Sequence, residues 1–278
     1  MSRLFPTLLL VFAAGTGLSA GEIPLIQAAY KNDFETAAEL IADGADVNRA
    51  NAYGVAPLSL ACQNANAPLI ELLLKSGANP DTTLNGGETA LMTASRTGKP
   101  EPVKLLLKSG ARVEATDWKQ QDALMWAVAE GHGDVTSLLL EAGADPTRTL
   151  ESGFNALFFA ARNGHRNVVQ ILLNHGVDPI VVSTNSKRIR KGIQKGTTAL
   201  RLAVENGHFE TAIVLLDAGA DPNDQQSGYA PLHILTWVRK ANRGDGDDGL
   251  PPPTIRGDLN SLDFARILVE DYSAEVDL

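Results

Sequence analysis

The stretch from Asp117 to Pro146, DWKQQDALMWAVAEGHGDVTSLLLEAGADP, decides the fold of this 278-residue chain. It contains two short helical patterns, with Gly131 between them and Gly143 after the second. The second pattern has apolar residues at positions i, i+3 and i+4, which is typical of a helix buried on one side. Asp122 can cap the first helix through its carboxylate, and Gly143 can close the second in a left-handed conformation. A helix pair of this size cannot bury its own apolar face, so it requires copies of itself on either side.

Such copies recur along the chain at a fixed spacing. The closing glycine recurs every 33 residues from Gly44 to Gly176, and then after 43 residues at Gly219. A leucine of the first helix follows the same steps from Leu58 to Leu200 and recurs at Leu232. A fixed period in this range is the signature of a solenoid, in which each repeat contacts only its neighbours.

These residues make the chain resemble an ankyrin repeat protein. The first helices carry APLSLA at 56–61, TALMTA at 89–94 and TALRLA at 198–203, and several units close with Gly-Ala-Asp. The family's Thr-Pro-Leu-His motif is intact nowhere, and only His233 keeps its histidine. The resemblance covers about 24–278. It implies an all-α solenoid of stacked helix–turn–helix units, whose projecting loops and first helices form a concave surface for a protein partner.

The repeat domain is predicted over residues 21–278. The first unit lacks the leading loop of a full repeat, and the last two units are interrupted by insertions. The final turn resembles one that opens a further repeat, so we expect the natural protein to continue past Leu278. The expected units are 24–49, 50–82, 83–115, 116–148, 149–181, 182–224 and 225–278, with inserts at 183–196 and 239–259.

Residues 1–20 are predicted to be a secretory signal peptide. Arg3 supplies a positive start, Leu4–Ala14 an apolar region and Gly17–Ala20 a small-residue cleavage region. The alternative is an uncleaved membrane anchor, which Pro6 weakens because a span needs about 20 mostly apolar residues. No later stretch is apolar enough to span, so we expect a periplasmic or secreted protein with no membrane span after cleavage.

Composition and motifs give no indication of catalysis. The formal net charge of −9 argues against general nucleic-acid binding, which requires a basic face. His132, His165 and His208 share one repeat position, but units stacked about 10 Å apart cannot bring them to about 2 Å from one metal ion. The only cysteine, Cys62, is predicted to be a small buried residue. We expect no catalytic residue, no metal and no cofactor.

Binding residues are instead expected on the concave surface, where the repeat positions place aromatic and charged side chains. Tyr, Trp and Arg are the residue types that anchor protein interfaces. Two further sets of Met and aromatic residues recur at repeat spacing, Met92/Met125/Phe158 and Trp126/Phe159. Their pattern favours a role in core packing over one in binding. The predicted binding residues are Tyr53, Trp118, Lys119, Phe154 and Tyr229 on loops, and Arg96, Glu130, Arg162 and Glu205 near the ends of first helices.

The insert at 183–196 forms a basic loop with no acidic residue. It could bind an acidic partner, a phosphate-bearing polymer or an anionic membrane surface. The alternative is a solvated finger without a binding role. The residues concerned are Lys187, Arg188, Arg190, Lys191 and Lys195.

Two functions of different classes remain open at this point. The first is an exported, non-catalytic scaffold that binds another protein through the concave surface. The second is the recognition arm of a larger exported enzyme or haem protein, whose other domain lies beyond residue 278. The fold indicates which surface can bind, but not which protein is bound.

Overall fold

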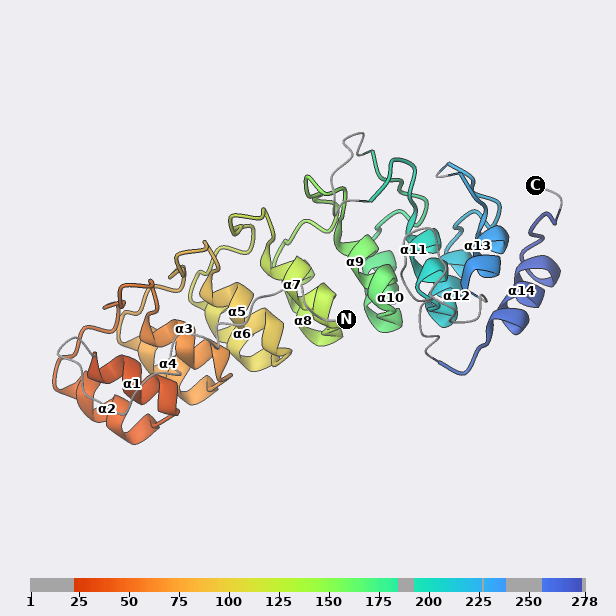
Figure 1. Cartoon of the computed structure of the whole chain (residues 1–278). Helices are drawn as coiled ribbons and strands as arrows, with labels where there is room; N and C mark the ends of the chain where they lie inside the picture. Colours follow the sequence, from red (N-terminus) through yellow and green to blue (C-terminus); the bar gives the residue numbers. More distant parts are fainter. Residues whose placement is uncertain (1–22, 185–192, 227, 239–256, 277–278) are drawn as a thin grey trace.

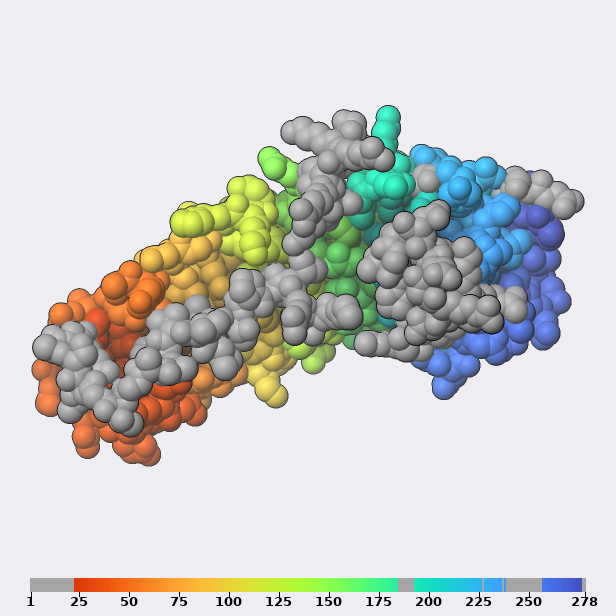
Figure 2. Space-filling model, in the orientation of Figure 1, coloured from red at the N-terminus to blue at the C-terminus, as the bar shows by residue number. Residues whose placement is uncertain are grey.

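The described part of the chain is a single row of helix pairs (Figure 1). The structure is a computed structural model that describes residues 23–184, 193–226, 228–238 and 257–276. Within these ranges it has fourteen α-helices and no strand beyond two isolated bridges. The pairs follow one another in chain order along an elongated body (Figure 2). The predicted all-α solenoid is therefore confirmed.

The first helix of each pair packs against the first helices of the neighbouring pairs, and the loops project from that edge (Figure 1). The outer helices form a second row, in which α2, α4, α6, α8, α10 and α12 contact one another in turn. The first helices are α1 (Pro24–Lys31), α3 (Pro57–Gln63), α5 (Ala90–Thr97), α7 (Ala123–Glu130), α9 (Ala156–Asn163), α11 (Ala199–Glu205) and α13 (Pro231–Val238). The second helices are α2 (Phe34–Ala42), α4 (Ala67–Lys75), α6 (Pro100–Lys108), α8 (Gly133–Glu141), α10 (Arg166–Asn174), α12 (Phe209–Asp217) and α14 (Ser261–Glu270).

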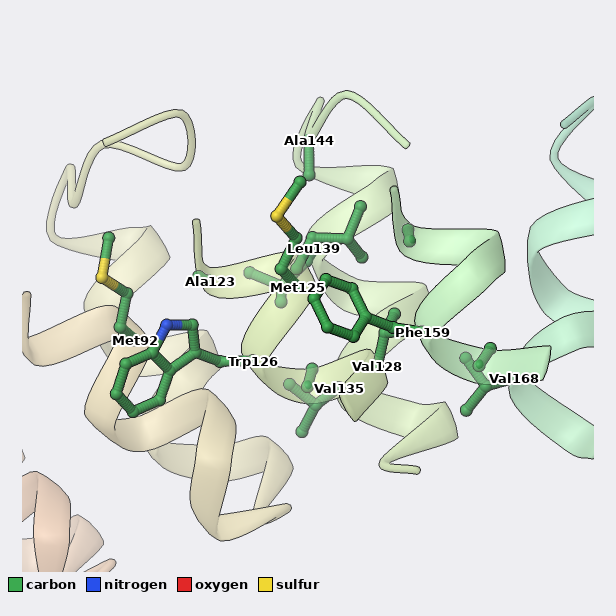
Figure 3. Packing of buried hydrophobic residues seen from close by; sticks show 14 of the residues in the cluster. Met92, Ala123, Met125, Trp126, Val128, Val135, Leu139, Ala144, Phe159 and Val168 are labelled. Carbon is green, nitrogen blue, oxygen red and sulfur yellow. The ribbon is translucent and has the colours of Figure 1, made fainter. Parts of the chain in front are cut away.

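The Met and aromatic sets at repeat spacing lie in the core, as predicted. Met92, Met125, Phe158, Trp126 and Phe159 are all buried. The Trp126 ring points from α7 towards Met92, and the Phe159 ring points from α9 towards Met125 (Figure 3). Each large side chain therefore fills space beside the preceding repeat, so the core is continuous from one helix pair to the next.

Cys62 is completely buried in α3, which confirms the prediction of a small core residue. Burial raises the pKa of its thiol well above the ordinary range. A thiol in this environment stays protonated and therefore unreactive in the folded protein.

Turn histidines join successive repeats. The Nε2–H of His132 donates to the carbonyl of Arg96 at 2.9 Å, and the Nε2–H of His165 donates to the carbonyl of Ala129 at 3.0 Å. Both acceptors belong to the first helix of the preceding pair. The ring of His165 also lies against Gly131, where an added Cβ would be 2.6 Å from Nδ1.

Gly131→Ala is expected to lower the free energy of unfolding by about 2–3 kcal/mol, because two costs combine. Gly131 has a positive φ of 82°, and its missing Cβ leaves room for the His165 ring. Gly143 also has a positive φ, 91°, but nothing lies within 4 Å of its added Cβ. Gly143→Ala should therefore cost only the conformational part, about 1–2 kcal/mol. If urea unfolding showed the same loss of unfolding free energy for both variants, the close approach of Gly131 to His165 would contribute nothing.

Asp122 caps α7 as predicted, and its carboxylate accepts a hydrogen bond from the amide of Met125 at 2.9 Å. The next repeat uses Asn155 in the same way, accepting from Phe158 at 2.9 Å. Burial of the Asp122 carboxyl raises its pKa, although the bond from Met125 and the nearby Arg148 act in the opposite direction. The folded protein therefore holds this proton more tightly than the unfolded chain does.

The charged Asp122 carboxylate should accordingly cost stability above its folded-state pKa, and this cost should vanish as the pH falls to the ordinary carboxyl range. Asp122→Asn keeps the cap without the charge. We expect it to be at least as stable as the wild type at pH 7, with a difference that shrinks on acidification. Asp122→Ala removes both the charge and the cap, so it should be about 1 kcal/mol less stable than Asp122→Asn at every pH. Thermal unfolding of both variants between pH 7 and the ordinary carboxyl range measures these differences. A stability advantage of Asp122→Asn that grew at low pH would contradict the raised pKa of Asp122.

Both inserts lie largely outside the described residues. The two ends of the first insert are joined to each other. Val182 forms a β-bridge with Thr198, and the amide of Ser183 donates to the carbonyl of Thr197 at 2.9 Å. Of its predicted basic residues, Lys195 is described and exposed. Lys187, Arg188, Arg190 and Lys191 lie outside the described residues, as do the predicted signal peptide 1–20 and residues 239–256 of the second insert.

After the second insert, the chain packs back onto the array. The amide of Leu259 donates to the carboxylate of Glu210 at 3.0 Å, and the amide of Glu275 donates to the side chain of Asn223 at 2.8 Å. Helix α14 then packs against α13. Across the described ranges, none of the helices combines the length and the apolar character that crossing a membrane requires.

Candidate functional site

The inner face, defined here as the exposed side of the first helices together with the loops that precede them, carries most of the predicted binding residues. The three most exposed aromatic side chains among the described residues are all on its loops. Trp118 is 79% exposed, Tyr229 is 65% exposed and Tyr53 is 58% exposed. Exposed aromatic side chains of this kind combine a large apolar area with a polar tip, which suits them to a protein interface.

Trp118 stands on a tight turn whose backbone is fixed by hydrogen bonds. The Asp117 carboxylate accepts from the amides of Lys119 at 2.8 Å and Gln121 at 2.9 Å. The amide of Trp118 itself donates to the carbonyl of Gly86, in the loop of the preceding repeat, at 3.1 Å. The turn is therefore held both within its own repeat and by its neighbour, so little backbone freedom remains to be lost when Trp118 binds a partner.

Phe154 differs from the expectation. It was predicted to be an exposed loop residue, but its side chain is only 5% exposed and its ring stacks on Phe159 with centroids 4.9 Å apart. Tyr229 holds the same place, two residues before its helix, and stays exposed. The repeat position alone therefore does not determine burial, and the prediction of Phe154 as an exposed binding residue is wrong.

Two arginines of the inner face lie over aromatic rings. The guanidinium of Arg96 is 5.2 Å from the centroid of the Trp126 ring. That of Arg162 is 4.5 Å from the Phe154 ring and 5.3 Å from the Phe159 ring. Both side chains are half-buried. Cation–π contacts of this type hold the guanidinium plane in one orientation.

Glu88 is a member of this face that the sequence analysis missed. Its carboxylate lies 3.8 Å from Arg96 and accepts a hydrogen bond from the Thr93 hydroxyl at 2.9 Å. Burial raises the pKa of Glu88, partly offset by the Thr93 bond and the Arg96 charge. Aligning the repeats would have indicated it, because Glu88 occupies the position of Gln121 and Phe154 in the next two units.

The remaining predicted residues lie in different surroundings. Lys119 and Glu130 are exposed, and Glu205 forms an ion pair with Arg201 at 2.7 Å. From Tyr53 before α3 to Tyr229 before α13, the predicted set extends along most of the array and does not converge on one cleft. In the described ranges, no three His, Cys, Asp or Glu side chains come together as a metal site would require.

The stacked helix pairs and the aromatic loops define a helical repeat protein. The chain matches a family model described as ankyrin repeats (three copies) over residues 5–84, 58–150, 98–188 and 124–226. The chain belongs to the ankyrin repeat family. The first match begins at residue 5, within the segment predicted to be a signal peptide. A comparison with curated proteins finds no match.

Family membership narrows the function to a class. Ankyrin repeats generally mediate protein–protein interaction and are typically non-catalytic. A protein is therefore the expected kind of partner for this chain.

Proposed function

We propose that this chain is an exported, non-catalytic scaffold that binds one protein partner through its inner face. The observation that carries the proposal is the exposure of Trp118, Tyr53 and Tyr229 on projecting loops, with Trp118 held on a hydrogen-bonded turn. Exposed aromatic anchors on a rigid support are the usual source of binding energy at protein interfaces.

Simultaneous replacement of Tyr53, Trp118 and Tyr229 by alanine tests the proposal. The full chain and the triple variant are used as affinity baits in extracts of the source cells, and captured proteins are quantified by mass spectrometry. We expect one protein to be captured strongly by the wild type and lost from the variant, with no change in thermal unfolding.

The double variant Leu262→Ala/Val269→Ala provides the matched control, because it removes two exposed apolar side chains from the outer helix α14. It should capture the same protein as the wild type. If the loop triple variant captures normally, or if the α14 variant loses the partner instead, the inner face is not the binding surface.

Export is the second part of the proposal, and it rests on the charge and apolar pattern of residues 1–20. We expect the mature protein to begin at Gly21 and to be recovered from the periplasm or the culture medium. Intact-mass analysis of the protein isolated from its own cells measures the N-terminus directly. A protein that retains Met1 or Ser2 would contradict cleavage.

A further inference from the structure

Arg162 is a cation of the inner face that has no acidic partner among the described residues. Its guanidinium lies over the Phe154 and Phe159 rings, at 4.5 Å and 5.3 Å from their centroids. Within the described ranges no carboxylate lies within 4 Å of it. Burial alone lowers the pKa of Arg162, and no neighbouring acid acts in the opposite direction.

The arginine at the equivalent position of another repeat does have an acidic partner. Arg96 occupies the same repeat position two units earlier, lies over Trp126 and has the Glu88 carboxylate at 3.8 Å. In the following unit this repeat position carries Glu205, which pairs with Arg201 of its own helix at 2.7 Å. The position equivalent to Glu88 in the repeat of Arg162 is occupied by Phe154, so a ring replaces the carboxylate.

The surroundings of Arg162 favour a carboxylate supplied from outside. The two rings hold the face of the guanidinium, which leaves its N–H groups at the edge to donate to a planar, bidentate acceptor. Ala129, which takes the same repeat position one unit earlier, is small and only half-buried, so it leaves room beside Arg162. A partly desolvated cation gains more from an arriving carboxylate than a fully solvated one does.

We propose that Arg162 receives an aspartate or glutamate side chain of the protein partner, so that the partner presents an acidic segment to the inner face. This inference rests on the proposed function and specifies the chemistry of the partner. A long polyanion such as a nucleic acid fits less well, because the chain carries a formal net charge of −9 and would repel it outside this local site.

The test is a selection of peptides from a random displayed library on the immobilised full chain. The selected peptides should be enriched in Asp or Glu. Binding of one such peptide should weaken about tenfold for Arg162→Ala, because a charge-assisted hydrogen-bonded contact is lost. Arg166→Ala is the matched control: it removes an exposed arginine from the outer helix α10 of the same repeat, away from the inner face, so the affinity for the peptide should change by less than about threefold. Arg162→Lys should bind more weakly than the wild type, since it keeps the charge without the planar fork.

A change in the peptide itself avoids any effect of these substitutions on folding. Replacing its acidic residue by Asn or Gln should weaken binding to the wild type about tenfold, and should make no further difference to Arg162→Ala. A library that yields no binder, peptides without acidic enrichment, or equal losses of affinity for Arg162→Ala and Arg166→Ala would overturn the inference. The inference would also be overturned, in favour of a nucleic acid, if an oligonucleotide displaced the peptide and no longer bound to Arg162→Ala.

Failure of this inference can be distinguished from failure of the proposed function. The proposed function is tested at Tyr53, Trp118 and Tyr229, none of which is changed here. If a protein were captured through those loop residues while Arg162→Ala bound the peptide normally, the proposed scaffold function would stand and only the proposal of an acidic partner would fail.

Discussion

Phe158→Ala should lower the free energy of unfolding by about 3–5 kcal/mol, the cost of emptying a fully buried aromatic site. Phe158 is among the largest completely buried side chains of the described residues and lies on α9 in the middle of the array. Each repeat of a solenoid is stabilised by its neighbours, so the loss should weaken the contacts of α9 with α7 and α11 as well as its own pair. Chemical denaturation followed by circular dichroism measures the change.

The chain offers its own control for this substitution. Met92 and Met125 occupy the same repeat position as Phe158 in the two preceding units, and both are buried. Phe158→Met is therefore expected to cost less than about 1.5 kcal/mol, because it nearly conserves volume and uses a residue that this position already accepts. If the methionine and alanine variants were equally destabilised, the loss could not be attributed to an emptied core site.

Trp118→Ala should weaken binding of the captured partner by about 2 kcal/mol, or roughly thirtyfold, and leave the unfolding curve unchanged. The side chain is 79% exposed, so its removal leaves no cavity, and surface substitutions of this kind change stability by less than about 0.5 kcal/mol. Isothermal titration of the partner with the wild type and the variant measures the effect.

Trp118→Phe and Leu262→Ala are the controls for this loss. Trp118→Phe keeps an aromatic ring on the same turn and should recover part of the affinity. Leu262→Ala removes an exposed apolar side chain of 56% exposure from outer helix α14 and should leave affinity unchanged. If Leu262→Ala lost as much affinity as Trp118→Ala, the interface would include the outer helices, contrary to the proposed function.

The helices and the core could be predicted because the same sequence pattern recurs in successive repeats. The Asp122 cap, the left-handed Gly143 and the burial of Met125 all follow from the local pattern of one unit, and the other units repeat that pattern. Local capping and periodicity depend on residues close in sequence, so one chain is enough to read them.

The arrangement of the inner face could be predicted only in part. The exposure of Trp118 matches its loop position, but Phe154 is buried because it packs on Phe159 and lies beneath Arg162. The pairing of Glu88 with Arg96 depends on the path of one loop over a helix. Such contacts are set by packing between elements, and residue type at a given repeat position does not specify them.

Hydrogen–deuterium exchange of the full chain with and without the captured partner tests the central claim most directly. The account predicts protection at the loops that carry Tyr53, Trp118 and Tyr229 and at the ends of first helices α5 and α9, with unchanged exchange in outer helices α4, α6 and α8. Protection confined to those outer helices, with the loops exchanging as in the free protein, would contradict it.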